Sequence, residues 1–133
     1  MKVGLAGQGA FGIKHLEAIQ KIPGVEVITL TGGNPESTKE VARKFAIPHW
    51  TGDLAESLEV PGLEAMILAT PTQMHASQTI QCLRAGKHVQ VEIPMSDNLK
   101  DAEEVVRVQQ ESGRIAMAGH TRRFNPCHQW IHR

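Results

Sequence analysis

The chain has no excess of charge of either sign, because 14 Lys and Arg balance 14 Asp and Glu over 133 residues. A nucleic-acid-binding module would show a basic excess, and a polybasic membrane arm would show a run of like charges. Apolar runs are also short, with none longer than five residues, whereas a membrane-spanning helix needs about 20. We therefore expect no nucleic-acid partner and no membrane partner.

Cysteine is scarce, with only Cys82 and Cys127. The first residues lack the long apolar core of a secretory signal. Without such a signal, two thiols are expected to stay free in a reducing compartment, so the sequence predicts a cytoplasmic protein without disulfide bonds. The length is that of one ordinary domain with one sizeable core.

Short apolar runs alternate with segments of helical periodicity along the whole chain. Such βαβ units need right-handed crossovers and a parallel sheet covered on both faces. The expected fold class is therefore α/β, a doubly wound parallel sheet (Rossmann fold) with strand order 3-2-1-4-5-6. Strands are expected at 2–6, 25–30, 49–51, 65–69, 88–92 and 115–119, and helices at 10–22, 34–46, 53–58, 74–85, 97–112 and from 126 onward.

The apolar positions of two helices predict which side chains face the core. Ser96 is expected to cap the helix over 97–112. The inward residues expected are Phe11, Leu16, Ile19 and Ile22 on the first helix, and Leu99, Ala102, Val105 and Val106 on the helix after Ser96.

Residues 7–12 match the pattern G-x-G-x-x-G between a predicted strand and a predicted helix, which is the context that a dinucleotide-binding loop requires. Gly7 permits the tight turn, Gly9 lets a pyrophosphate approach the backbone, and Gly12 lets the helix pack closely. Free N–H groups at the helix start would then receive the phosphates. The alternative is a tight turn that binds nothing. The candidate cofactor-binding residues here are Gly7, Gln8, Gly9, Ala10, Phe11 and Gly12.

The end of the second strand has no carboxylate to hold the ribose 2′-hydroxyl of NAD, because residues 30–34 read Leu-Thr-Gly-Gly-Asn. A 2′-phosphate would therefore meet no repulsion, and nearby donors and positive charges favour NADP, with NAD still possible. The alternative is that Lys39 and Arg43 form only the solvated face of a helix. The candidate cofactor-binding residues here are Gly33, Asn34 and Thr38.

Three further segments have a distinctive wording: TPTQMH at 70–75, AGKHVQVEIP at 85–94 and GHTRRFNP at 119–126. Together with the glycine loop, in order and at the right spacing, they resemble the Gfo/Idh/MocA family of NAD(P)-dependent oxidoreductases. The resemblance covers the whole chain. It implies a cofactor-binding domain over 1–125, with 126–133 beginning the helix that leads to a second domain missing from this chain. That second domain would bind a small-molecule substrate and form the interface of a homo-oligomer.

The resemblance also implies site residues. Family members usually read Glu-Lys-Pro with a catalytic lysine where this chain has Ile93, which cannot transfer a proton. The family's catalytic Asp and His would lie beyond Arg133, so the catalytic residues stay unknown. Glu92 should lie near the nicotinamide, although it could be an ordinary strand-end carboxylate. The implied cofactor-binding residues are Thr70, Pro71, Thr72, His75 and Glu92, and the implied substrate-binding residues are Ile93, Pro94, Arg122 and Arg123.

Within the family, the wording is most similar to enzymes of bacterial degradation of lignin-derived aromatics. This similarity implies NADP-linked oxidation of the hemiacetal of a carboxylated semialdehyde to a lactone. Arg122 and Arg123 are suitable clamps for carboxylates, although they could also be solvated hinge residues. The alternatives are a sugar or inositol dehydrogenase of the same family, and a stand-alone dinucleotide-binding or sensing module without catalysis.

Four histidines have uses that the sequence leaves open. His75 starts a helix and could contact the cofactor or act as a cap. His15 is expected on a helix surface or in a supporting contact. His128 and His132 are four residues apart beside Cys127, but no third ligand stands at a firm spacing, so no metal site is expected.

Overall fold

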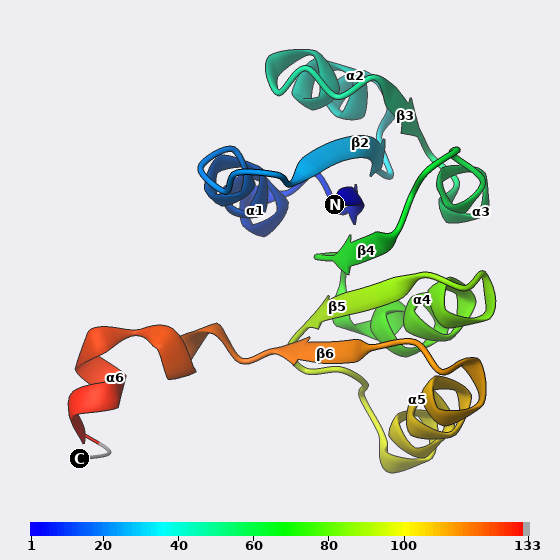
Figure 1. Ribbon diagram of the computed structural model, residues 1–133, viewed down its shortest axis with the longest axis vertical. Helices are drawn as coiled ribbons and strands as arrows, with labels where there is room; N and C mark the ends of the chain where they lie inside the picture. Colours follow the sequence, from blue (N-terminus) through cyan, green and yellow to red (C-terminus); the bar gives the residue numbers. More distant parts are fainter. Residues whose placement is uncertain (132–133) are drawn as a thin grey trace.

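The computed structural model describes residues 1–131 and contains one six-stranded sheet. Its order, β3-β2-β1-β4-β5-β6, is the order predicted from the sequence (Figure 1). Every neighbouring pair is parallel. The strands agree with the predicted ranges to within one residue at each end: β1 (Lys2–Ala6), β2 (Glu26–Thr31), β3 (His49–Thr51), β4 (Ala65–Leu68), β5 (His88–Glu92) and β6 (Ala116–Gly119).

Helices cover both faces of the sheet. Figure 1 places α3, α4 and α5 on one side and α1 on the other, and α2 shares a core cluster with α1. In β1, Leu5 packs into this cluster, whereas Ala6 packs into the cluster under α3, α4 and α5. A strand with both faces buried explains why the apolar runs show no alternation. The helices are α1 (Ala10–Ile19), α2 (Pro35–Lys44), α3 (Leu54–Leu58), α4 (Thr72–Arg84) and α5 (Leu99–Ser112).

Four helix boundaries differ from the prediction by two residues or more. Helix α2 ends at Lys44 instead of residue 46. Helix α1 ends at Ile19 instead of residue 22, and α4 begins at Thr72, two residues before the expected start. Helix α5 begins after Asn98, whose Oδ1 accepts the N–H of Asp101 at 2.9 Å. The predicted cap Ser96 is wrong, because its hydroxyl donates to the carbonyl of Asn98 instead.

Four residues predicted to face the core are exposed. The buried stripe of α5 runs through Val105 and Val108. Val106 lies about 100° around the helix from Val105 and is 48% exposed. Ile22 lies beyond the end of α1, where helical periodicity no longer applies. The exposed set is Phe11, Ile22, Leu99 and Val106.

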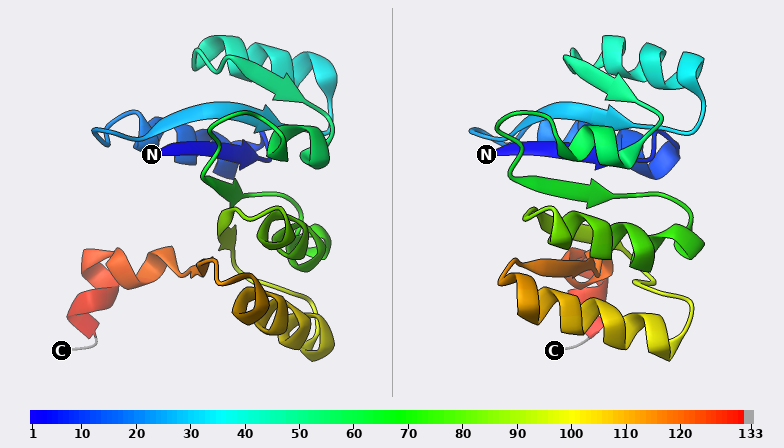
Figure 2. Two further views of the ribbon diagram at one scale, coloured as in Figure 1. Left: turned by 45° about the vertical axis from the view of Figure 1, so that its right-hand side comes forward. Right: turned by 90° about the vertical axis from the view of Figure 1, so that its right-hand side faces the viewer.

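Helix α6 (Pro126–Ile131) projects away from the sheet and is joined to β6 by the short 3-10 helix η1 (Thr121–Phe124), as Figure 2 shows. Neither segment buries a residue. The helix predicted to begin at Pro126 is therefore confirmed, and its continuation into a second domain stays a prediction. Across residues 1–131, no helix is long and apolar enough to cross a membrane.

Both cysteines are free, as predicted, with Cys82 buried and Cys127 exposed. Burial raises the pKa of the Cys82 thiol to about 12. This side chain therefore stays protonated and acts as a small apolar residue in the core cluster under α3, α4 and α5.

The packing of this core can be tested by the same Leu→Ala substitution at a buried and at an exposed position. Leu83 on α4 is 1% exposed, whereas Leu99 on α5 is 73% exposed. We expect Leu83→Ala to lower the free energy of unfolding by about 2–5 kcal/mol, because it removes packed atoms and leaves a cavity. Leu99→Ala should change it by about 0.5 kcal/mol or less. Urea denaturation measures both, and equal losses would contradict the packing described.

Candidate dinucleotide-binding cleft

A cleft of about 830 Å³ lies at the carboxyl ends of β1 and β4, where the strand order reverses. Ligands of doubly wound sheets bind at this kind of position. Six of the sequence-predicted residues line it: Gly7, Gln8, Gly9, Gly33, Thr70 and Pro71. The sequence reasoning did not nominate Thr31, Asp53, Met74 and Gln78, which also line the cleft.

The glycines of the loop have the geometry that a pyrophosphate requires. Gly7 has a φ of +105°, and a Cβ there would lie 2.4 Å from the carbonyl oxygen of Ala69. A Cβ on Gly12 would lie 1.8 Å from the carbonyl oxygen of Gly7. A Cβ on Gly9, by contrast, would meet nothing within 4 Å. Two glycines are thus required by the fold, and the third leaves open space facing the cleft.

Two helices begin at this cleft without a side-chain cap. Helix α1 has Gly9 at its N-cap and α4 has Pro71, and neither receives a side-chain hydrogen bond. Helices α2, α3 and α5 are instead capped by Asn34, Asp53 and Asn98. Backbone N–H groups at an uncapped helix start are free to bind an anion. The residues present therefore fit a dinucleotide pyrophosphate.

At the predicted adenosine end, Gln8 reaches from the glycine loop to α2. Its Nε2 donates to the hydroxyl of Ser37 at 3.2 Å. A Cβ on Gly32 would collide with the Gln8 amide, so this glycine makes room for the bridge. The nearest carboxylate that lines the cleft is Asp53, between β3 and α3. A search for a carboxylate after the third strand, as well as after the second, would have found it.

The prediction for Thr38 is corrected by the structure. This residue is fully buried, and its hydroxyl donates to the carbonyl oxygen of Asn34 one turn earlier in α2. A buried and partnered hydroxyl does not reach the cleft. The Oδ1 of Asn34 accepts the N–H of Ser37. Neither residue lines the cavity, and neither do the predicted Ala10, Gly12 and Pro94.

A smaller cavity of about 170 Å³ shares Thr70 with the cleft and marks its other end. His75 lies at its base, with Nε2 2.7 Å from the carbonyl oxygen of Thr70 and Nδ1 2.7 Å from that of Pro94. The ring therefore ties the loop after β4 to the loop after β5 and does not cap α4. Besides Thr70, five predicted residues line this cavity: Phe11, Thr72, His75, Glu92 and Ile93.

Glu92 ends β5 and pairs with His15 of α1. Its Oε1 lies 2.8 Å from Nε2 of His15, and Nε2 of Gln90 donates to the same oxygen at 3.3 Å. The structure thus places His15 in direct contact with Glu92. Ile93, where the family usually has lysine, is 43% exposed beside Glu92.

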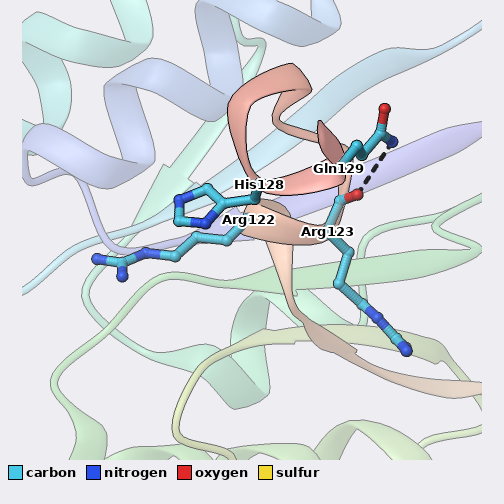
Figure 3. A pocket seen from close by; sticks show the side chains of 4 residues that line it. All are labelled: Arg122, Arg123, His128 and Gln129. Atoms are coloured by element: carbon cyan, nitrogen blue, oxygen red, sulfur yellow. Dashed lines mark hydrogen bonds between the residues drawn. The ribbon is translucent and has the colours of Figure 1, made fainter. Parts of the chain in front are cut away.

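Arg122 and Arg123 line a separate cavity of about 400 Å³ together with His128 and Gln129. Figure 3 shows Arg122 and His128 extending to the same side of the segment, whereas Arg123 extends the other way. Gln129 donates to the carbonyl oxygen of Arg123 at 3.0 Å. The convergent basic pair is thus Arg122 with His128 and not the two arginines.

The histidine pair considered for a metal is not tested, because His132 lies outside the described residues. Within residues 1–131, no group of three or more His, Cys, Asp or Glu side chains is placed to hold a metal ion.

The Gfo/Idh/MocA family model, described as an oxidoreductase family with an NAD-binding Rossmann fold, matches residues 1–120. The chain belongs to this family. Over 132 residues it is 52% identical to 4-carboxy-2-hydroxymuconate-6-semialdehyde dehydrogenase of Sphingobium sp. (strain NBRC 103272 / SYK-6), covering 99% of this chain and 42% of that protein. It is 30% identical to scyllo-inositol 2-dehydrogenase (NAD(+)) of Bacillus subtilis (strain 168), covering 96% of this chain and 38% of that protein.

The fold also matches the crystal structure of scyllo-inositol dehydrogenase from Lactobacillus casei with a TM-score of 0.92 at 22% identity. That match covers 98% of this chain and 39% of the other. The chain thus spans about two fifths of the length of its Gfo/Idh/MocA relatives. Residues 1–120 have the NAD-binding Rossmann fold of this oxidoreductase family.

Substitutions at Gly9 and Gly12 distinguish an effect on dinucleotide binding from an effect on folding stability. We expect Gly9→Val to weaken dinucleotide binding at least about 100-fold, or about 2.7 kcal/mol, because its side chain would fill the space for the pyrophosphate. Its thermal stability should stay near that of the wild type. Gly12→Ala should instead lower the free energy of unfolding by about 1–3 kcal/mol or more, because the added carbon meets backbone. Calorimetric titration with NADPH and thermal melts check both variants. Unchanged binding in Gly9→Val would contradict the site.

Proposed function

We propose that the full-length protein is an NADP-dependent dehydrogenase that oxidises the hemiacetal of a carboxylated semialdehyde to a lactone. The observation that carries the cofactor part is the cleft with two uncapped helix starts and open space at Gly9. The substrate part is supported by the 52% identity to a semialdehyde dehydrogenase and by Ile93 in place of lysine.

The preference for NADP is supported by the end of β2, where Thr31 and Gly32 line the cleft without a carboxylate. Asn34 and Ser37 add neutral polar groups at the start of α2. Asp53 favours the second candidate, NAD, because a carboxylate in the cleft could accept from ribose hydroxyls. Its Oδ1 already accepts the N–H of Ala55 at 2.8 Å, so we place NADP first.

The bound nicotinamide would supply the acceptor for a hydride. The glycine loop and the first turns of α1 and α4 would hold the phosphates, and Gln8 would define one wall toward the adenosine. His75 would keep the two loops of the reactive end at a fixed separation, because it spans the carbonyls of Thr70 and Pro94.

The substrate class follows from the missing lysine. Oxidation of an ordinary alcohol needs a base for the hydroxyl proton, and Ile93 cannot be that base. A cyclic hemiacetal has a more acidic hydroxyl than a simple alcohol and therefore needs less help. Its carboxylates would suit Arg122. A sugar or inositol dehydrogenase is the alternative within the family, and a non-catalytic binding module is the alternative outside it.

We also propose that the full-length protein works as a homo-oligomer in the cytoplasm. The two free thiols suit a reducing compartment. The exposed apolar side chains on η1 and α6, which are Phe124, Trp130 and Ile131, suit a covered surface in the assembly.

Cofactor choice can be tested at Asn34. Aspartate caps helices as well as asparagine does, so Asn34→Asp should fold normally. Its added charge should repel a 2′-phosphate and lower the NADPH-to-NADH affinity ratio about tenfold, or about 1.4 kcal/mol. Asn98→Asp makes the same change at the cap of α5, away from the cleft, and should leave the ratio unchanged. Titrations with both cofactors measure the effect. Equal wild-type affinity for both, unmoved by Asn34→Asp, would refute the NADP assignment.

The carboxylate clamp can be tested by comparing the two arginines. Because Arg122 converges with His128, Arg122→Ala should lower kcat/KM for the semialdehyde about 10–100-fold, as expected for loss of a charged hydrogen bond of about 1.5–3 kcal/mol. Arg123→Ala should have a smaller effect. Steady-state kinetics of the full-length protein measure both. Unchanged kinetics in the double variant, or efficient oxidation of neutral sugars with none of semialdehydes, would sink the substrate proposal.

A further inference from the structure

Two side chains, His15 and Gln90, form a cradle around the carboxylate of Glu92 at the nicotinamide end proposed for the cleft. His15 reaches it from α1 at 2.8 Å, and Gln90 reaches it along β5 at 3.3 Å. Both nitrogens contact the same oxygen, Oε1. Glu92 is 8% exposed, so this carboxylate is held in one orientation and is not a freely moving surface group.

A glycine on the neighbouring strand makes room for this arrangement. Gly119 of β6 is the register partner of Glu92. A Cβ at residue 119 would lie 2.6 Å from Nε2 of Gln90 and 3.0 Å from Oε1 of Glu92. Three elements, α1, β5 and β6, therefore shape the surroundings of one carboxylate.

The second oxygen of Glu92 is left available. Among the described residues, Oε2 has no hydrogen-bond partner, and it is not among the fully buried unpartnered atoms. Glu92 lines the small cavity together with Thr70, Thr72 and Ile93. The titratable groups that face this cavity or the carboxylate are His15 from α1 and His75 from α4. Among residues 1–131, no lysine or arginine lines the cavity to occupy the free oxygen.

We propose that Glu92 is the proton acceptor of the oxidation and that His15 is its positioning residue. The inference rests on the proposed function only in that a substrate hydroxyl is oxidised. The proton of the substrate hydroxyl passes to Oε2 of Glu92. The carbon that carries this hydroxyl loses a hydride to the oxidised nicotinamide, and its bond to the hydroxyl oxygen becomes double. His15 and Gln90 hold Oε1, so that Oε2 is the oxygen presented to the substrate. The carboxylate thus takes the part that Ile93 cannot play.

The test uses the full-length protein with a Glu92→Gln variant, which keeps the shape of the side chain but removes the proton acceptor. We expect kcat to fall about 10²–10⁴-fold, the range of general base catalysis, with the NADPH dissociation constant within about threefold of wild type. Glu26→Gln makes the same change on β2, at an exposed position, and should leave kcat unchanged. Fluorescence titration of NADPH gives the affinity without requiring turnover.

Variants of His15 give a second test of the proposal, which remains available if the Glu92→Gln variant does not fold. His15→Ala should lower kcat about tenfold with little change in KM, because Glu92 loses its orientation. His15→Gln should restore part of this loss, since its amide can still donate to Oε1. A purely structural histidine would not give rescue together with an effect confined to kcat.

The outcomes separate this inference from the substrate proposal. If the wild type oxidises inositols and not the semialdehyde, the proposed substrate is wrong, and the same variants compared on inositol still test Glu92. A kcat in Glu92→Gln within about threefold of wild type would overturn the acceptor role. A loss of NADPH affinity as large as the loss of kcat would also overturn it, because Glu92 would then only bind cofactor. A wild type that oxidises neither substrate would overturn both proposals.

Discussion

The close approach of α1 to the loop before it is the constraint on which the rest of the site depends. Gly12 lies so near the carbonyl of Gly7 that no side chain fits between them. This contact aims the uncapped start of α1 at the cleft. It also fixes the helix face one turn later, where His15 meets Glu92 and Leu16 enters the core, because residues three and four apart share a face. One steric requirement thus positions both the phosphate end and the reactive end.

Each strand end contributes a different part of the proposed ligand site. In the proposed function, the ends of β1 and β4 would supply backbone N–H groups for the phosphates, and the end of β2 with the start of α2 would surround the adenosine. The end of β5 presents Glu92, whose carboxylate is oriented by His15 and Gln90. Beyond β6, Arg122 and His128 form a basic pair on the segment that leaves the sheet. This division agrees with the general rule that parallel sheets bind ligands at their carboxyl edge.

Much of this arrangement could be predicted from the sequence, because strand runs, glycine spacing and turn residues act locally. The strand order and the glycine loop followed from such signals. Two of the errors came from tertiary packing, and a third came from a hydrogen bond within one helical turn. Val106 and Leu99 look apolar and inward on a helical wheel, but the stripe that α5 buries is offset. Thr38 looks available at a helix start, but its hydroxyl bonds within its own turn. The His15–Glu92 pair joins residues 77 positions apart, and no local pattern reveals such a contact.

The central claim is that one cleft holds a nicotinamide dinucleotide between the glycine loop and the Glu92 cradle. The most direct measurement is a crystal structure of the full-length protein grown with NADPH. We expect the pyrophosphate against the backbone N–H groups that begin α1, and the nicotinamide in the cavity that Thr72, Glu92 and Ile93 line. A cofactor bound elsewhere, or a nicotinamide turned away from Glu92, would contradict the account.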